Sequence, residues 1–217
     1  MKDIAMRFVY SLLCVLFLGA AATAHAETAP NQVVQGIVDD LGKTMETRRA
    51  ELSKDRESLL KTIDGIVLPH FDIDYASILV LGPNARSASP EQRARFAHAM
   101  YNSIAHRYAE GLLNYTKGRV HVLPSKGELS EKRSIVRTEV VLDDGKTLAV
   151  DYAFRKTKEG DWKAYDEIIE GISYITNYRN QVGVEIQKSS LDALIARLET
   201  QGDKVLQSME KDQKGGS

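Results

Sequence analysis

The chain has 217 residues, of which 29 are basic and 30 are acidic, so its formal net charge is −1. Proteins that bind nucleic acid need a strongly basic surface, and nothing in this composition suggests one. The length suffices for one domain with its own apolar core.

The N-terminus has the pattern of a cleaved secretory signal. Lys2 and Arg7 precede an apolar run over residues 8–22. Ala24-His25-Ala26 follows this run and has the small-x-small pattern of a signal-peptidase site. A bilayer span needs about 20 apolar residues and this run is shorter, although a retained N-terminal anchor is the alternative. We expect residues 1–26 to be removed together with Cys14, the only cysteine. The mature protein then has no disulfide and no thiolate metal site.

Apolar residues at helical spacing predict helices over residues 31–48, 55–67, 72–81 and 90–114. Pro69 ends the second of them. Ser89 and Gln92 flank Pro90 with the spacing of a capping box, in which the serine caps the next turn and the glutamine reaches back. This motif marks the start of the longest helix in the first half of the chain.

The pattern then changes to alternation, which predicts a four-stranded antiparallel meander over residues 119–123, 134–142, 147–155 and 161–169. Asp144-Gly145 provides a hairpin turn between the middle strands, because glycine accepts a positive φ angle. Strict alternation places Trp162, Ala164 and Asp166 on one face of the last strand. The meander therefore has one apolar face.

Two helices are expected after the sheet. One covers residues 170–187, and the other follows a capping signature at Ser189 and Asp192 and runs to about residue 200. The polar residues 201–217 are expected to form a disordered tail. Together the elements predict a single domain over residues 27–200 of the α+β class, with N-terminal helices, a curved sheet and C-terminal helices.

Two polar groups of residues have the spacing of metal ligands. The first group is His70, Asp72 and Asp74, and the second is His98, Asn102 and His106. The first three are better interpreted as a helix start in which Asp72 is the cap. The last three lie four residues apart on one helix face and lack the glutamate of a zinc-protease motif, which favours a solvated face. We expect no metal site.

Asp166, Glu167 and Glu170 are candidates for acid–base chemistry. A structural hydrogen bond at the end of a strand is the favoured role for Asp166. The sequence has no nucleophile elbow and no glycine-rich phosphate loop. We therefore expect neither an enzyme nor a resident cofactor.

Several ordered motifs resemble those of the MlaC family of periplasmic phospholipid carriers, also called the toluene-tolerance family. They are Leu79-Val80-Leu81-Gly82, residues 86–93, Val136-Arg137-Thr138-Glu139, Asp151-Tyr152, residues 162–166, Glu170-Gly171-Ile172-Ser173 and Asn177-Tyr178-Arg179. The resemblance spans nearly the whole chain after the signal segment.

The resemblance implies a helix-and-sheet fold with an apolar cavity that holds phospholipid acyl chains. It also implies a periplasmic shuttle between an outer-membrane lipoprotein–porin complex and an inner-membrane ABC transporter with an MCE-domain ring, which maintains outer-membrane lipid asymmetry. Another apolar cargo such as a hopanoid is the first alternative. A small-molecule enzyme in an α+β cone, with Asp166 or Asp151 facing the cavity, is the second. A monomer is expected.

We predict that the cavity is lined from the sheet and from the helices around it. The predicted lining is Phe71, Tyr75, Met100, Tyr108, Leu112, Val136, Val140, Leu148, Val150, Tyr152, Phe154, Trp162, Ile168 and Ile172. Arg86, Arg93 and Arg95 are candidate contacts for a protein partner, with plain solvated charge as the alternative.

Overall fold

The computed structural model describes the backbone of residues 29–124 and 130–215 and the side chains of these residues as far as 209. The predicted signal segment lies outside the described residues. In the described ranges, no helix combines the length and apolar character needed to cross a membrane. The elements are α2 Pro30–Leu52, α3 Arg56–Val67, the 3-10 turn η1 Leu68–His70, α4 Ile73–Leu81, the 3-10 turn η2 Gly82–Arg86, α5 Pro90–Leu112, β1 Val120–Val122, β2 Arg133–Val141, β3 Thr147–Lys156, β4 Trp162–Ile169, β5 Ile172–Ser173, α6 Tyr174–Lys188 and α7 Leu191–Gly215.

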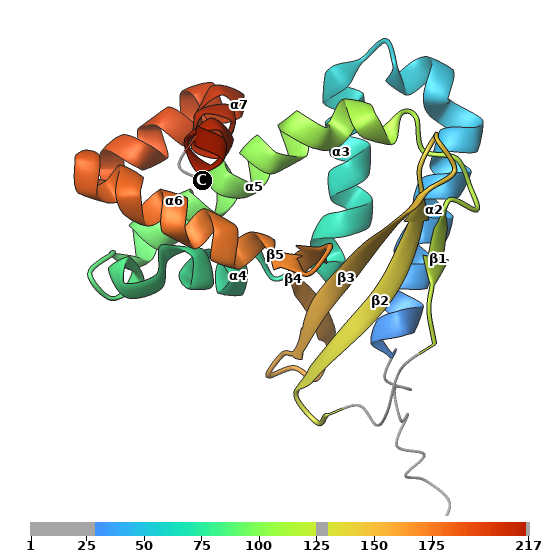
Figure 1. Cartoon of the computed structure of the whole chain (residues 1–217), viewed down its shortest axis with the longest axis horizontal. Coiled ribbons are helices and arrows are strands. Elements are labelled where there is room, and N and C mark those ends of the chain that lie inside the picture. Colours follow the sequence, from blue (N-terminus) through green and yellow to red (C-terminus); the bar gives the residue numbers. More distant parts are fainter. Residues whose placement is uncertain (1–28, 125–129, 216–217) are drawn as a thin grey trace, which may run out of the picture.

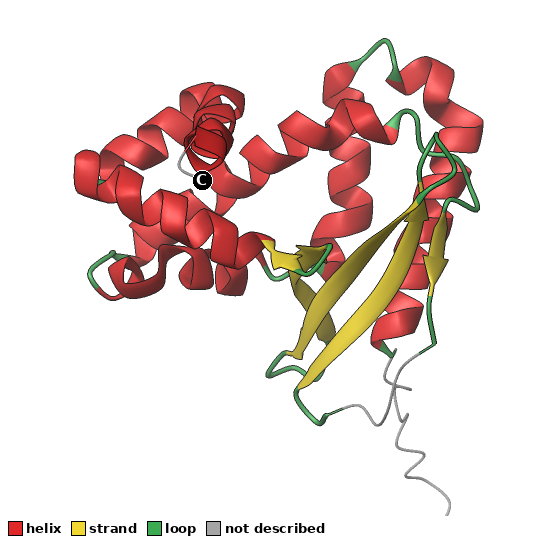
Figure 2. Ribbon diagram, viewed as in Figure 1, coloured by secondary structure: helices red, strands yellow, loops and turns green. Residues whose placement is uncertain are grey.

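The elements form two lobes that share α5 (Figure 1). The sheet lobe contains α2, α3 and all the strands, and the helix lobe contains α4, α6 and α7. Figure 2 shows that helices and strands are segregated in this way rather than alternating. The α+β class and the antiparallel sheet are therefore confirmed. The long helix α5 begins in the helix lobe and ends beside α3.

The predicted helix starts are confirmed by their caps. The side chain of Asp55 accepts from Ser58 N, and that of Asp72 accepts from Tyr75 N. Ser89 and Gln92 make both bonds of the capping box at 3.1 and 2.9 Å. Each cap satisfies backbone donors that a helix leaves open in its first turn.

The cap of α7 differs by one residue from the prediction. The Oγ of Ser190 accepts from Ala193 N at 3.1 Å, so Ser190 and not Ser189 is the cap. Ser189 instead ends α6, where its hydroxyl donates to Glu185 O at 3.0 Å. Because Ser189 and Ser190 are adjacent, the sequence alone is compatible with either serine as the cap of α7.

The sheet is a meander in the order β1-β2-β3-β4-β5, and every strand pairs antiparallel to its neighbour. It has one strand more than predicted, because Ile172–Ser173 pairs with the end of β4 before α6 begins. A tight reversal at Glu170 and Gly171, with φ angles of 49° and 80°, makes this last pairing. The turn at Gly145 has φ 82°, as a hairpin there requires.

A β-bulge at Tyr165 reverses the alternation of β4. Phe154 pairs with Ala164, but Ala153 pairs with Asp166, so Tyr165 is an additional residue on β4. The prediction that Asp166 shares a face with Trp162 and Ala164 is therefore wrong. An extra residue moves every later side chain to the opposite face, since strands have a period of two.

The residues predicted to form a tail continue α7 instead. The helix extends to Gly215 across a kink at Gln201, whose φ and ψ are −144° and 36°. Val205, Leu206 and Met209 are buried in the helix lobe. Their spacing is helical, but only these three apolar residues occur in an otherwise polar segment, so the apolar stripe is weak in the sequence.

The helix lobe has a filled core. Its fully buried side chains come from α4, α5, α6 and α7 and include Leu81, Phe96, Val182, Leu194, Ile195 and Leu206. At the kink in α7, Gly202 lies directly against Ser103 of α5, and a Cβ on Gly202 would lie 2.1 Å from the Ser103 Oγ. Only glycine allows the two helices to approach this closely.

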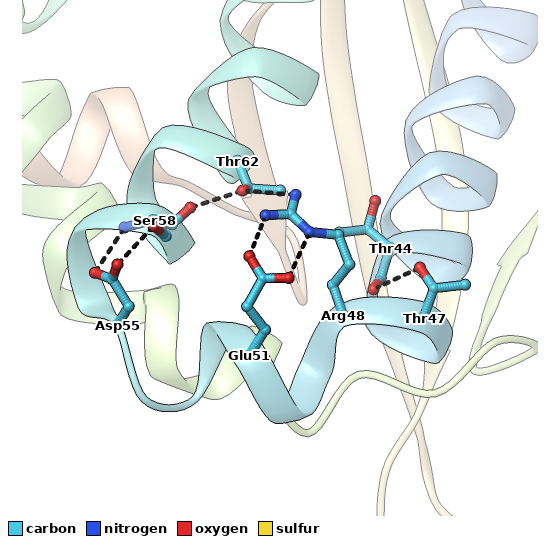
Figure 3. A network of polar contacts seen from close by, with 7 residues as sticks. All are labelled: Thr44, Thr47, Arg48, Glu51, Asp55, Ser58 and Thr62. Atoms are coloured by element: carbon cyan, nitrogen blue, oxygen red, sulfur yellow. Dashed lines mark hydrogen bonds and ion pairs between the residues drawn. The ribbon is translucent and has the colours of Figure 1, made fainter.

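In the sheet lobe, α3 is held on α2 by a polar network around the turn between them (Figure 3). Arg48 pairs with Glu51 at 2.7 Å and reaches Thr62 of α3 at 3.4 Å. Thr62 in turn donates to Ser58 O, one turn after the Asp55 cap. The network fixes the start of α3, which packs on α2 and α5 beside the sheet.

Candidate functional site

One face of the sheet, which we call the inner face, is aliphatic and turned toward α2. Register and alternation place on it Val120, Val122, Ser134, Val136, Thr138, Val140, Leu148, Val150, Tyr152, Phe154, Lys156, Trp162, Ala164, Glu167, Ile169 and Ile172. Most of the predicted sheet lining lies on this face. Helix α2 packs across β1, β2 and β4.

The end of the inner face near Trp162, which we call the closed end, is sealed by side chains. Val136, Phe154, Trp162 and Ala164 are buried together with Val33 and Val34 of α2. Phe71 packs against this cluster, and its backbone pairs with Ala164. The closed end is thus ordinary apolar core.

The opposite end of the inner face, beside the Asp143–Lys146 turn, is less covered. We call it the hairpin end. Val140, Leu148 and Ile169 are only half-buried there, whereas Val150 between them is 4 % exposed. The hairpin end therefore offers aliphatic surface that the chain itself does not fully cover.

Two polar side chains lie between the closed end and the hairpin end. Tyr152 pairs with Val136 on one side and with Glu167 on the other, so all three point to the inner face. Burial raises the pKa of Glu167, and the neighbouring carboxylate of Asp166 raises it further. Burial also raises the pKa of Tyr152, and the charges of Glu167 and Tyr115 add to this.

The other face of the sheet, the outer face, joins the lobes. Asp166 accepts from Ser173 Oγ at 2.6 Å and from Ile175 N at 3.0 Å, so it anchors the first turn of α6. The expected structural hydrogen bond of Asp166 is confirmed. A carboxylate at a helix N-terminus also gains from the helix dipole.

Arg155 provides the second link between the lobes. Its Nε donates to Asp72 Oδ2 at 2.7 Å, and its guanidinium lies 4.3 Å from the ring centre of Tyr75. Tyr75 meets Tyr165 edge to face at 5.2 Å. Because Arg155 points to the outer face, Tyr75 belongs to this junction and not to the inner face, where we predicted it.

Other predicted lining residues lie apart from the inner face. Ile168 pairs with Asp151 on the outer face, a consequence of the bulge. Met100 is buried in the core of the helix lobe, and Leu112 packs against the cluster between α2, α3 and α5. Tyr108 of α5 is 42 % exposed. Ile172 is the exception, because it pairs with Ile169 and so lies on the inner face at the β5 edge, where it is 60 % exposed. Helical periodicity shows which face of a helix is apolar but not which partner covers it.

Of the three arginines predicted to contact a partner, two are used inside the molecule. Arg93 donates to Ala85 O and Ala88 O, which closes η2 onto α5. Arg95 forms a bidentate pair with Glu199 of α7 at 3.0 and 2.8 Å. Arg86 is exposed and remains the candidate with an available guanidinium.

A polar groove of about 710 Å³ lies in the helix lobe between α5 and α7, at the kink of α7. His98, Asn102 and His106 line it and are exposed, as expected for a solvated helix face. No cluster of potential metal ligands occurs in the part of the chain that the structure describes. Most of the residues that line the groove are polar, among them Arg95 and Glu199, so we take the hairpin end as the candidate apolar site.

The sequence reasoning missed Ile169 and Glu167 on the inner face. Strict alternation from Trp162 assigned both to the opposite face. The available signal was the run Ile168-Ile169, because two adjacent apolar residues break alternation and are compatible with a bulge.

Comparison with known proteins agrees with this fold. The family described as "MlaC protein" matches residues 35–200. The Intermembrane phospholipid transport system binding protein MlaC of Haemophilus influenzae is 29% identical over 181 residues, which cover 82% of this chain and 84% of that protein. The Toluene tolerance protein ttg2D of Pseudomonas putida is 27% identical over 182 residues, 83% of each chain.

A solved structure has the same architecture. It is a phospholipid-binding protein from Ralstonia solanacearum in complex with a phospholipid, with a TM-score of 0.73 and 23% sequence identity. The match covers 83% of this chain and 99% of that one. With the family match extending from α2 into α7, the chain belongs to the MlaC family.

Proposed function

We propose that this protein is a periplasmic carrier that holds phospholipid acyl chains against the inner face of its sheet. One observation carries the proposal. The aliphatic residues Val140, Leu148 and Ile169 at the hairpin end are only half-buried, beside a closed end that is completely packed. Family membership and the phospholipid bound to the Ralstonia relative support it.

The physical requirement is set by the cargo. Each methylene that leaves apolar surroundings for water costs about 0.8 kcal/mol, so a two-chain lipid needs an extended apolar surface in transit. A partly covered aliphatic face can supply it when α2 and α3 move apart from the sheet. The contact is non-directional, which permits both uptake and release.

Delivery requires contacts with membrane-bound partners. We assign to this chain the family's route between an outer-membrane lipoprotein–porin complex and an inner-membrane MCE-domain ABC transporter. Arg86 is the arginine left available for such a contact, since Arg93 and Arg95 bind within the chain. An Arg86→Glu variant should lose partner affinity in a salt-dependent manner; equal affinity at low salt would remove Arg86 from the interface.

A hopanoid or another apolar lipid is the alternative cargo, because contacts with aliphatic side chains such as Leu148 do not select among apolar lipids. The enzyme alternative loses Asp166 and Asp151, the two carboxylates predicted to face the cavity. Asp166 is bonded to Ser173 and Ile175, and Asp151 points to the outer face. Neither carboxylate lies on the inner face.

The test is to purify the protein, extract it with organic solvent and identify the lipid by mass spectrometry. We expect phospholipid near one equivalent in the unaltered protein. Leu148→Arg places a charge in the hairpin end and should lower the bound lipid at least tenfold, because an unpaired charge is costly in apolar surroundings.

Ile135→Arg is the matched control. Ile135 lies on the outer face and is 49 % exposed, so the same substitution there should leave bound lipid unchanged. Equal lipid content in Leu148→Arg and Ile135→Arg, with both variants folded by circular dichroism, would contradict the assignment of the inner face.

A further inference from the structure

The turn between β4 and β5 has an unusual residue at its first position. Glu170 and Gly171 have positive φ angles, 49° and 80°, and they join Ile169 to its partner Ile172. Two-residue hairpin turns with this backbone favour asparagine followed by glycine. In the part of the chain that the structure describes, Glu170 is the only residue other than glycine with a positive φ angle. Such a conformation is costly for a residue with a side chain and often marks a functional constraint.

The side chain of Glu170 bonds to the neighbouring strand β3. Its Oε1 accepts from Ala149 N at 2.8 Å, and its own backbone N donates to Ala149 O at 3.0 Å. In a regular antiparallel pair, both bonds of this rung come from the backbone. Because the chain turns at Glu170, the carboxylate takes the place of the backbone carbonyl. The need to reach Ala149 gives a reason for glutamate at a position where the turn favours asparagine.

This bond ties β5 to the part of β3 that carries the hairpin end. Ala149 follows Leu148, whose side chain points to the inner face. β5 has only two residues, so its backbone pairing with β4 is short. At the other end of β5, Ser173 Oγ donates to Asp166 at 2.6 Å. Two carboxylates, one at each end, therefore fix the position of β5.

Ile172 is the residue of β5 that a bound lipid can contact. It pairs with Ile169 and points to the inner face, where it is 60 % exposed. With the half-buried Ile169 and Leu148, it continues the aliphatic surface of the hairpin end to the edge of the sheet. An acyl chain on this surface would remove the Ile172 side chain from water, which stabilises the complex.

We propose that Glu170 is a positioning residue for the cargo, because its bond to Ala149 holds β5 where Ile172 contacts the acyl chain. The inference rests on the function proposed above and adds to it a residue that controls how long the lipid stays bound. Glu170 acts through Ile172 and not by touching the lipid. Loss of the bond should therefore speed lipid release while the rest of the aliphatic surface stays in place.

The variant that separates the bond from the turn is Glu170→Asn. Asparagine suits the left-handed position and is one methylene shorter, so it keeps the turn and loses the bond to Ala149. Full-length protein loaded with radiolabelled dioleoyl phosphatidylethanolamine is mixed with excess phosphatidylcholine vesicles, and release of the label is followed over time. We expect release about fivefold faster, the ratio that corresponds to one net hydrogen bond of about 1 kcal/mol. The urea midpoint should not fall, since the backbone of the turn is less strained.

Two control variants define the comparison. Glu170→Gln keeps an oxygen acceptor at the same reach and should release lipid at nearly the rate of the unaltered protein. Glu139→Asn makes the same change as Glu170→Asn on β2, directly across from Ala149 on the exposed outer face, and should have no effect. Hydrogen exchange of the Ala149 amide, measured by NMR, should be faster in Glu170→Asn than in Glu170→Gln. Equal exchange in the two variants would contradict the bond.

A double variant tests the route through Ile172. Ile172→Ala alone should speed release about tenfold, the effect of roughly two methylene groups of lost contact. Adding Glu170→Asn to Ile172→Ala should change the rate less than about twofold, because the side chain that Glu170 positions is already absent. A further fivefold acceleration would show that Glu170 acts by another route, and the positioning role would be wrong.

The release assay also distinguishes this inference from the proposed function. If the unaltered protein takes up no phospholipid, the proposed function fails. If it takes up phospholipid and Glu170→Asn releases it at the unaltered rate, the carrier function stands and Glu170 serves only the turn.

Discussion

The pKa of a glutamate side chain is shifted in opposite directions in the two lobes. In the helix lobe, Glu185 of α6 is bonded to Arg197 of α7 at 2.8 Å and to Lys188 at 3.2 Å. Burial alone would raise the pKa of Glu185, but these bonds outweigh it and the pKa is lowered. In the sheet lobe, Glu167 has no such partner and burial raises its pKa.

The two lobes also differ in how completely their apolar side chains are buried. The helix lobe buries Leu194, Ile195, Leu206 and Phe96 completely, whereas the hairpin end leaves Leu148 half-covered. The comparison indicates that the helix lobe is the more completely packed part of the fold, whereas the hairpin end of the sheet lobe retains partly exposed aliphatic surface. Regions that bind ligands are commonly the less completely packed part of a fold.

The largest expected effect is a difference between two leucine truncations. Leu194→Ala should lower the free energy of unfolding by about 2 to 5 kcal/mol, because it leaves a cavity in a filled core. Leu148→Ala should cost at most about 1 kcal/mol, since its side chain is already partly exposed. Urea denaturation of lipid-free protein measures both. Equal losses would show that the hairpin end is packed as tightly as the helix lobe.

The next effect concerns the close approach of α5 and α7. Gly202→Ala should lower the free energy of unfolding by about 1 to 3 kcal/mol, because the new methyl group overlaps the Ser103 Oγ. Gly183→Ala in α6 is the control, since a Cβ at that glycine has no atom of another element within 4 Å. A neutral Gly202→Ala variant would mean that the kink in α7 relaxes freely.

The smallest effect is the pH dependence of stability, and its sign differs between the lobes. The lowered pKa of Glu185 contributes stability above its unfolded pKa of about 4.3, and this is lost as pH falls through the folded value. The raised pKa of Glu167 acts in reverse, so its contribution is present below the unfolded pKa and is lost as pH rises through the folded value.

Two glutamine variants check these signs in lipid-free protein. Glu185→Gln should cost about 1 to 2 kcal/mol at neutral pH and flatten the loss in acid. Glu167→Gln should leave acid stability nearly unchanged and raise stability on the alkaline side by about 1 kcal/mol. Thermal unfolding across pH measures both, and the same pH dependence in the two variants would contradict the difference between the lobes.

Local signals predicted most elements of the fold. The capping box at Ser89 and Gln92, the cap at Asp72 and the turn at Gly145 are all encoded within a few residues and are confirmed. The bulge at Tyr165 was not predicted, because it depends on how β3 and β4 pair. It moved Asp166 and Ile168 away from the predicted site and brought in Glu167 and Ile169.

The sequence by itself determined the order of helices and strands, the apolar alternation of the sheet and the family, because each depends on short-range periodicity or on ordered motifs. Only the tertiary structure decided which apolar residues share a core. The sequence pattern assigned Met100, Tyr75 and Leu148 alike to the apolar lining. In the structure, Met100 lies in the filled core of the helix lobe, Tyr75 lies at the lobe junction, and Leu148 lies on the partly covered inner face. The physical reason is that burial depends on the neighbouring element, and the register of β4 is set across strands rather than along the chain.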